Sequence, residues 1–175
     1  MTDDLTGVRT HRDDLHGDLS KPQSMCCLVD IASLIWVNDQ SGHDQGNRVL
    51  AAVAGSIEHT LAPHRASLFR VGGDEFLAVI QEPDRGQSRA IALRIVADVQ
   101  ALALPYKQAD HRLVGRRQRT CVQVNAAIVT ASDALAGISE TRGITDEFRN
   151  RVALAVYREK QHLGVDAGVV VDLIG

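Results

Sequence analysis

Short apolar runs alternate with amphipathic stretches along this chain of 175 residues. The run at 25–31, MCCLVDI, is almost continuously apolar, which predicts a buried central strand. The runs at 66–70 and 75–80 flank Gly72 and Gly73, so we expect a hairpin whose tight turn uses glycine at positive φ. The stretches CVQVNAAIV at 121–129 and GVVVDLI at 168–174 predict two further strands.

Between these strands the apolar residues recur at helical spacing. This spacing predicts helices over 47–61, 88–102 and 144–162, with one or two helical turns at 33–39 and a polar helix with loose ends at 5–20. The order contains β-α-β-β-α-β, which is the ferredoxin-like motif. The predicted fold class is therefore α+β, with an antiparallel sheet and helices on one face. The other face, or the strand ends, should be free for chemistry.

The length fits one domain, so we expect a single domain over 1–175 that includes a helical motif at 1–20 and a basic loop at 105–120. Lys107 and four arginines give this loop its charge. It is either a solvated loop or a grip for phosphates or an acidic partner. We favour the solvated loop, because runs of charge most often form solvent-exposed surface.

Composition and charge exclude several classes of protein. The chain has 45% hydrophobic and 23% charged residues, as a soluble globular protein does, and a net charge of −3, which argues against nucleic-acid binding. We expect no membrane span, because no apolar run approaches the required length of roughly 20 residues. We expect no signal peptide, because the acidic and polar start of the chain has no apolar segment of the kind that such a peptide needs. Cys26, Cys27 and Cys121 fit neither a disulfide framework nor a zinc spacing, so we expect reduced thiols in the core of a cytoplasmic protein.

Acids stand at the ends of two strands that should be neighbours. Asp30 lies near the end of the first strand, and Asp74 and Glu75 follow the glycines of the hairpin. Two carboxylates at adjacent strand ends can hold Mg²⁺, which prefers oxygen ligands and substrate phosphates. Two such ions can activate an attacking hydroxyl and stabilise a leaving phosphate. Acids are also common at turns for local reasons, so spacing alone leaves both interpretations open.

The segment VGGDEF at 71–76 resembles the signature of GGDEF domains, the diguanylate cyclases. Four more segments resemble motifs of that family, in the same order. DDLTGVRTHR is similar to D-x-L-T-G-L-x-N-R, and LVDIASLIWVNDQSGHDQGN is similar to D-x-D-x-F-K-x-x-N-D-x-x-G-H-x-x-G-D. VQVNAAIV resembles V-T-V-S-I-G-V-A, and ALAVYREKQHLG resembles A-L-Y-x-A-K-x-x-G-R-N. The match extends over nearly the whole chain.

This resemblance implies a ferredoxin-like palm of the nucleotidyl-cyclase type and a nucleotidyltransferase activity in second-messenger signalling. In the family, two GTP molecules, one per subunit of a homodimer, condense to cyclic di-GMP and pyrophosphate. By position, Asp30 and Asp74 would ligate Mg²⁺, or Mn²⁺ in its place, with help from the Ile31 carbonyl. Glu75 would be the third catalytic acid, which supports the site and assists proton removal. Substrate would be bound by the backbone N–H groups of Ala32, Ser33 and Leu34 (phosphates), by Asn38 and Asn47 (base) and by Lys160 (terminal phosphates).

The chain departs from the family pattern at several of these positions. Ala32 replaces the second acid of D-x-D, and Ile35 replaces the lysine that follows it. The arginine of the last motif has no clear counterpart after Lys160. Because each charge-assisted hydrogen bond is worth about 1.5–3 kcal/mol, two missing cations should weaken triphosphate binding. Arg158 or the basic segment at 107–119 could compensate.

Asn47 stands where the family has an aspartate that accepts two hydrogen bonds from guanine. Asn offers one acceptor and one donor, which suits adenine as it does in DNA readout. An ATP-using or mixed-nucleotide cyclase is therefore one hypothesis. The alternative is that Asn47 caps the helix expected at 47–61, since Asn is a favoured cap residue.

Two expectations concern regulation. The family's product-inhibition motif, R-x-x-D, falls on PHRA at 63–66, where Pro63 and Ala66 replace the arginine and the aspartate. We therefore expect no feedback inhibition through that site. The chain begins almost at the first family motif, which suggests a freestanding cyclase, a piece of a longer chain, or a subunit regulated by another protein.

A third function, besides the two cyclase hypotheses, is a degenerate GGDEF module that binds a nucleotide or a protein partner without turnover.

Overall fold

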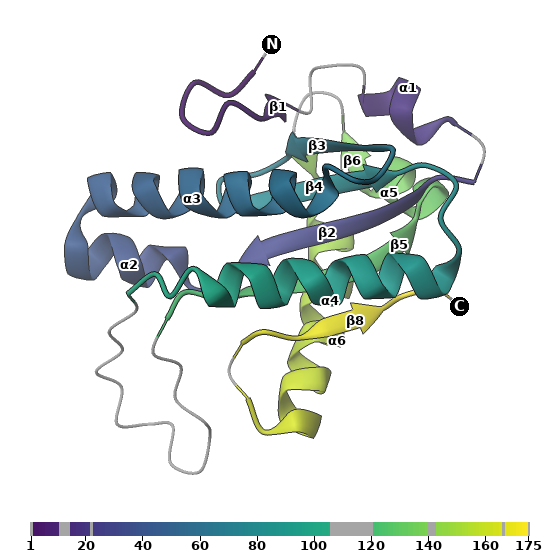
Figure 1. Cartoon of the computed structure of the whole chain (residues 1–175). Coiled ribbons are helices and arrows are strands. Elements are labelled where there is room, and N and C mark those ends of the chain that lie inside the picture. Colours follow the sequence, from purple (N-terminus) through teal and green to yellow (C-terminus); the bar gives the residue numbers. More distant parts are fainter. Residues whose placement is uncertain are drawn as a thin grey trace.

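The computed structural model describes residues 2–10, 15–21, 23–105, 121–139, 143–165 and 167–174. Its main sheet is built around strand β2 (Met25–Ile31), because nearly all side chains of this strand are apolar. The strand order is β1-β3-β4-β2-β5-β8, and only the two edge pairs, β1 with β3 and β5 with β8, are parallel (Figure 1). The other strands are β1 (Arg9–Thr10), β3 (Ala66–Arg70), β4 (Glu75–Ile80), β5 (Val124–Thr130) and β8 (Val170–Asp172), while β6 (Ile138–Ser139) and β7 (Gly143–Ile144) form a separate ribbon.

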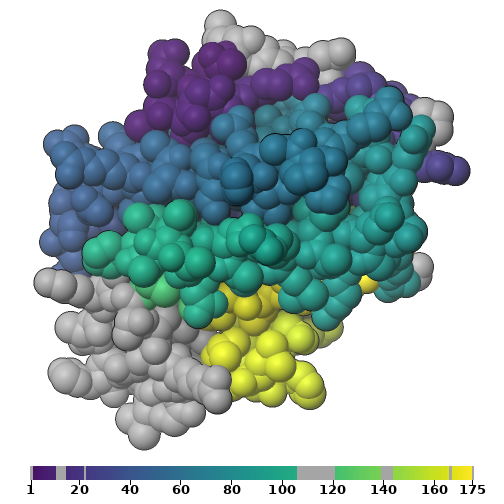
Figure 2. Space-filling model, in the orientation of Figure 1, coloured from purple at the N-terminus to yellow at the C-terminus, as the bar shows by residue number. Residues whose placement is uncertain are grey.

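Three helices cover the first face of this sheet: α2 (Leu34–Ser41), α3 (His43–Leu61) and α4 (Arg85–Ala101). The long helices α3 and α4 run side by side across it (Figures 1 and 2). They pack on alternate residues of β2, namely Cys27, Val29 and Ile31. The predicted β-α-β-β-α-β order is confirmed, and the two helices of this unit, α3 and α4, lie on one face of the sheet as expected.

Both long helices begin a few residues before their predicted starts. Helix α4 starts at Arg85 because the Asp84 carboxylate accepts a hydrogen bond from the Gln87 backbone N–H, and the Gln87 side chain accepts one from the Asp84 N–H. This reciprocal pair is a capping box, which satisfies two N–H groups at the helix end. Helix α3 starts at His43, directly after Gly42, which has a φ of +83°.

The second face of the sheet is also covered, so only the strand ends remain open to a ligand. Helices α1 (Leu15–Leu19), α5 (Ala131–Gly137) and α6 (Asp146–Leu163) pack there against Cys26 and Leu28 of β2. The reason is that both sets of alternating residues in β2 are apolar, and a sheet that is apolar on both faces needs two covering layers. None of the described helices is both long enough and apolar enough to cross a membrane.

The helix expected at 5–20 forms only at Leu15–Leu19 among the described residues. Earlier in the chain the Asp3 carboxylate accepts hydrogen bonds from the Thr6 N–H and hydroxyl at 2.9 and 2.7 Å, and Gly7 adopts a φ of +72°. Such local bonds between side chain and backbone compete with helix formation. The chain turns back instead and enters β1. The basic loop expected at 105–120 lies outside the described residues beyond Pro105.

The cysteine prediction is confirmed for two of the three thiols. Cys26 and Cys27 are free and buried, and because they are neighbours on one strand they point into opposite cores. Burial raises the pKa of the Cys27 thiol to about 12. Cys121 is also free and is only partly buried. We infer that these thiols contribute to packing rather than to chemistry.

Gly137, the last residue of α5, allows α6 to pack closely. A Cβ at this position would collide with the ring and the Cβ of the buried Phe148. We therefore expect Gly137→Ala to lower the free energy of unfolding by about 1–3 kcal/mol in urea denaturation, which is the usual cost of overpacking. Gly55→Ala is the matched control: it lies within α3 with nothing within 4 Å of a new Cβ, and should stabilise by about 0.5–1 kcal/mol. Similar changes in the two variants would contradict this view of the α5–α6 contact.

Candidate active site

A row of three polar side chains crosses the sheet at the end of β2. The register places Asp30 opposite Glu75 of β4 on one side and opposite Asn125 of β5 on the other. Opposing residues of paired strands point to the same face, so all three project to the side covered by α6. Glu75 and Asn125 are buried. Asp74 precedes β4, and its carbonyl accepts a hydrogen bond from the Ile31 N–H at 3.1 Å. The three acids predicted from the sequence therefore do meet.

Helix α6 and this row enclose a pocket of about 510 Å³. Its apolar wall comes from both the sheet and the helix, through residues such as Leu28 and Val152. The polar residues that line it are Asp30, Asp74, Glu75, Asn125, Arg149, Tyr157 and Lys160. All three predicted acids and the predicted phosphate ligand Lys160 thus share one pocket.

Two carboxylates of this pocket, those of Asp30 and Asp74, are poorly compensated. Burial, and then the charge of Asp74, raise the pKa of Asp30 from 3.8 to about 6. A hydrogen bond from Asn125 and the charge of Lys160 act in the opposite direction. Burial and then Glu75 also raise the pKa of Asp74. The arrangement favours the arrival of a cation, since a positive charge between Asp30 and Asp74 would relieve both effects.

Glu75 is already held by a cation from α6. The Arg149 Nε donates to Oε1 at 3.0 Å and its Nη2 donates to Oε2 at 3.1 Å. This two-point ion pair raises the pKa of Arg149. Both oxygens of Glu75 are therefore engaged, which favours the supporting role expected for this residue over its expected role in proton removal.

The first glycine of the signature is needed for space rather than for backbone conformation. A Cβ at Gly72 would overlap Oε2 of Glu75 and would lie in tight contact with its Cβ and Cδ. Positive φ occurs at four other glycines of the described residues, so the prediction of a positive-φ turn at Gly72 and Gly73 was wrong. The hairpin instead closes through the Val71 N–H, which donates to the Glu75 carbonyl at 3.0 Å.

A contact between distant motifs anchors the signature turn. The Arg70 Nη1 donates to both carboxylate oxygens of Asp3 at 2.9 Å, and Nη2 donates to the Gly73 carbonyl. Asp3 belongs to the first motif and Gly73 to the signature. The N-terminal turn therefore helps to hold Asp74 in position.

The expected phosphate cradle at the start of α2 is changed in one respect. The Ala32 N–H donates to the Gln123 carbonyl at 3.0 Å, so this amide already has a partner. Ser33 and Leu34 remain as candidates. Ser33 has a φ of +63°, which is uncommon for a residue other than glycine, and strain of this kind is often found at functional sites.

The two asparagines expected to contact a base lie near the junction of α2 and α3. Asn38 is partly buried and packs so closely on Gly46 that a Cβ there would overlap its side chain. Asn47 is exposed and lies inside α3, four residues after the start of that helix. The suggestion that Asn47 caps a helix was therefore wrong, because the cap position is Gly42. Ile35, which replaces a family lysine, is 73% exposed.

Sequence reasoning missed Asn125 and Arg149. Asn125 interrupts the apolar run VNAAIV, and Asn is depleted in strands, so its presence was a usable signal. Arg149 had no such signal, because nothing distinguishes it locally from the other arginines of the chain. Arg158, which was expected to compensate for missing cations, is exposed and does not line the pocket, and the basic segment at 107–119 lies outside the described residues.

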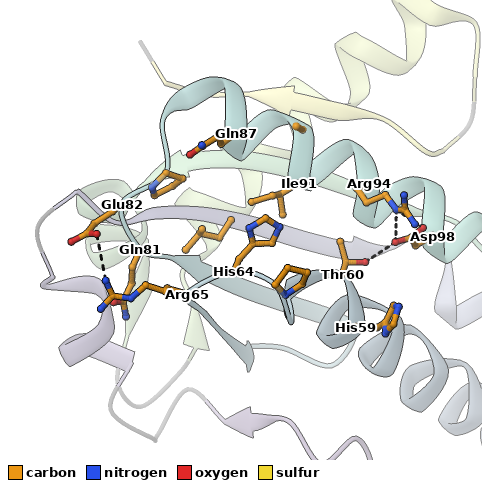
Figure 3. A pocket seen from close by; sticks show the side chains of 14 residues that line it. His59, Thr60, His64, Arg65, Gln81, Glu82, Gln87, Ile91, Arg94 and Asp98 are labelled. Carbon is orange, nitrogen blue, oxygen red and sulfur yellow. Dashed lines mark hydrogen bonds and ion pairs between the residues drawn. The ribbon is translucent and has the colours of Figure 1, made fainter.

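A second pocket, of about 580 Å³, lies at the opposite end of the hairpin between α3 and α4 (Figure 3). Several of its polar side chains pair with one another. Asp98 accepts from Arg94 Nε at 2.7 Å and from the Thr60 hydroxyl at 2.9 Å, and Arg65 bonds to Glu82 at 3.5 Å. It holds none of the predicted catalytic residues, so the candidate active site is the pocket at Asp30. It does include Pro63, His64 and Arg65 of the expected inhibition motif.

The oxygen atoms of the first pocket suit a hard cation. No group of three or more His, Cys, Asp or Glu side chains is arranged to hold a metal in the part of the chain that the structure describes. Two carboxylates remain, together with the buried Oδ1 of Asn125, which has no hydrogen-bond partner. Mg²⁺ is commonly bound through one or two carboxylates and completes its shell with water and substrate phosphates. The donor set of Asp30 and Asp74 fits that pattern.

Comparisons with known proteins identify the family of the chain. Residues 2–117 match the family model described as diguanylate cyclase, GGDEF domain. The cyclic di-GMP phosphodiesterase PdeB of Shewanella oneidensis is 30% identical over 115 residues, which is 63% of this chain and 13% of that protein. The probable diguanylate cyclase DgcT of Escherichia coli is 31% identical over 108 residues, or 62% of this chain and 22% of that protein. The chain thus corresponds to a small part of each relative.

Solved structures give the same fold. The GGDEF domain of DgcB from Caulobacter crescentus, crystallised with c-di-GMP, matches 98% of this chain and 92% of its own with a TM-score of 0.67. The identity is 20%, so this likeness concerns the fold and confirms the α+β palm. Together with the family match over most of its length, it shows that this chain belongs to the GGDEF domain family of diguanylate cyclases.

Proposed function

We propose that this chain is a Mg²⁺-dependent nucleotidyltransferase that condenses two GTP molecules into cyclic di-GMP. One observation carries the proposal: two poorly compensated carboxylates, Asp30 and Asp74, meet at adjacent strand ends in a pocket that Lys160 also lines. Family membership supports the cyclase reaction in general. The identity of the metal and the activity of this member are part of the proposal.

Asp30, Asp74 and the Ile31 carbonyl would hold Mg²⁺, or Mn²⁺ in its place. The bound ion would supply charge stabilisation at the reacting phosphate and lower the pKa of the attacking hydroxyl. Lys160, which lies on α6, binds the terminal phosphates. The N–H groups of Ser33 and Leu34 at the start of α2 bind phosphate oxygens, since helix N-termini favour anions.

The reaction needs two copies of the chain. We infer that each subunit binds one GTP, with its base near Asn38 and Asn47, and that a homodimer brings the two together. Each 3′-hydroxyl oxygen forms a bond to the α-phosphorus of the other nucleotide. The bond from that phosphorus to the β-phosphate oxygen breaks, and two pyrophosphates leave with the bonding electrons. The hydroxyl protons pass to water.

Two other functions have support from particular residues. Asn47 is not a helix cap, which favours a role in base choice and hence an adenine-containing product from ATP. The exposed Ile35 and the missing family arginine favour a degenerate module that binds a nucleotide or a protein partner. Regulation by a separate protein and a cytoplasmic location stay predictions.

The function is tested by incubating the protein with Mg²⁺ and GTP, ATP or both, and identifying the products by mass spectrometry. We expect cyclic di-GMP from GTP, and no product from Asp74→Ala. An adenine-containing product that disappears in Asn47→Asp would instead make Asn47 the residue that selects the base. Protein that is folded and dimeric but yields no product with any nucleotide would contradict the cyclase proposal.

The raised pKa of Asp30 predicts a pH-dependent cost in stability. The folded state holds this proton more tightly than the unfolded chain, so stability falls as pH rises from 3.8 to about 6 and stays low above it. Without divalent cations, Asp30→Asn should therefore be about 3 kcal/mol more stable than wild type near pH 7.5, at about 1.4 kcal/mol per pKa unit. This gain should vanish below the ordinary pKa of 3.8.

Urea denaturation at both pH values measures this difference. Asp39→Asn, at an exposed position of α2, is the control and should show no such pH dependence. Mg²⁺ should stabilise wild type, because a ligand stabilises the state that binds it. It should not stabilise Asp30→Asn, because this variant lacks one of the two carboxylates that bind the ion. An Asp30→Asn gain of equal size at both pH values would show that the buried charge is not its cause.

Feedback inhibition is expected to be absent. Pro63 and Ala66 cannot supply the guanidinium and the carboxylate of the family's inhibition motif. Calorimetric titration with cyclic di-GMP should therefore show no tight binding at the second pocket. Tight binding that is lost in His64→Ala and Arg65→Ala would overturn this expectation.

A further inference from the structure

Arg149 on α6 is the least expected residue of the site. Its guanidinium holds both oxygens of Glu75, at 3.0 and 3.1 Å. The Glu75 side chain is only 10% exposed, whereas the Arg149 side chain is 46% exposed. The pair joins two residues that are 74 positions apart in the sequence, and so ties the first turn of α6 to the signature hairpin.

Neighbouring residues fix the position of both partners of this ion pair. Thr145 caps α6 by accepting from the Phe148 N–H at 3.4 Å, and its carbonyl accepts from the Arg149 N–H at 2.9 Å. Asp146 accepts from Arg149 Nη1 at 3.1 Å. On the other side, the absence of a side chain at Gly72 leaves the space that Oε2 of Glu75 occupies. The two-point geometry is therefore fixed independently at each end.

The consequence concerns the number of carboxylates that a cation would meet. Glu75 faces Asp30 across the β2–β4 pair and follows Asp74 directly. If it were free, three carboxylates could converge on one ion. Arg149 removes Glu75 from that set, and two remain. A site with two carboxylates leaves coordination positions for substrate phosphates, which a crowded acidic site would not.

We propose that Arg149 is a positioning residue that withholds Glu75 from the cation, so that Asp30 and Asp74 alone bind it. This inference rests on the proposed function only for the existence of the cation site. The ion pair between Arg149 and Glu75 would also keep the affinity of the site for the cation moderate, because one carboxylate fewer binds it. A merely structural link between α6 and the hairpin would have no such effect on the cation.

The test measures Mn²⁺ binding to the whole chain by electron paramagnetic resonance of the free ion. Arg149→Met removes the guanidinium but keeps an unbranched apolar stem, and it frees Glu75. We expect Mn²⁺ to bind about tenfold more tightly, the effect of roughly one added charge a few ångströms from the ion. In Arg149→Met/Glu75→Gln the affinity should return to that of wild type, because the freed carboxylate is gone.

Two further variants separate position from charge and from helix packing. Arg151→Met makes the same charge change on the same helix, but Arg151 pairs with Asp133 at 3.4 Å, so the affinity should not change. Arg149→Lys keeps the charge but cannot form two parallel bonds to a carboxylate. It should bind Mn²⁺ with an affinity between those of wild type and Arg149→Met. Circular dichroism at the assay temperature identifies the variants that are folded.

The outcomes are distinct. Folded Arg149→Met that binds Mn²⁺ as wild type does, or more weakly, would falsify the inference and leave Arg149 as a structural link. Tighter binding that persists in the double variant would show that Arg149 does not act through Glu75. If neither wild type nor Arg149→Met binds Mn²⁺, the cation site falls together with this inference. Normal Mn²⁺ behaviour with no cyclic dinucleotide would overturn only the cyclase proposal.

Discussion

The cost of keeping the partly buried carboxylates of Asp30 and Asp74 charged at the end of β2 is the constraint to which the rest of the site responds. Burial of Asp30, and then the negative charge of Asp74 beside it, raise the pKa of Asp30 to about 6. The protein offsets this cost only in part, through Asn125 on one neighbouring strand and Lys160 on α6. A residual cost of this kind is common at sites that bind cations, because stability is exchanged for affinity.

The position of the site follows from how the sheet is covered. Both faces of the sheet are apolar and carry helices, so polar groups can reach a ligand only at the strand ends. Helix α6 packs against the sheet and also contributes residues to the site. Phe148, Val152 and Val156 bury one side of it, while Arg149 and Lys160 line the pocket beside them. A change in how α6 docks would therefore alter both stability and the charges that face the carboxylates.

The departures from the family pattern form a consistent set. The chain lacks a lysine at Ile35 and an arginine after Lys160, and both losses remove positive charge expected near the phosphates. Arg149 adds a cation to the same pocket, but it is committed to Glu75 and cannot simply replace them. The site therefore differs from the family pattern in the charges available to hold a triphosphate, while its two open carboxylates are kept.

Local patterns in the sequence determined the β-α-β-β-α-β order and the two acids Asp30 and Asp74, because strand and helix periods and signature motifs are short-range properties. The same patterns gave a wrong prediction at Gly72, because a glycine can serve either a positive-φ turn or close packing. At Gly72 its role is to leave space. The tertiary structure alone decided which residues stand beside Asp30. Asn125 is there through strand register, and Arg149 through the docking of α6 across 74 residues of chain. Such pairs depend on how elements pack in space, which no local pattern records.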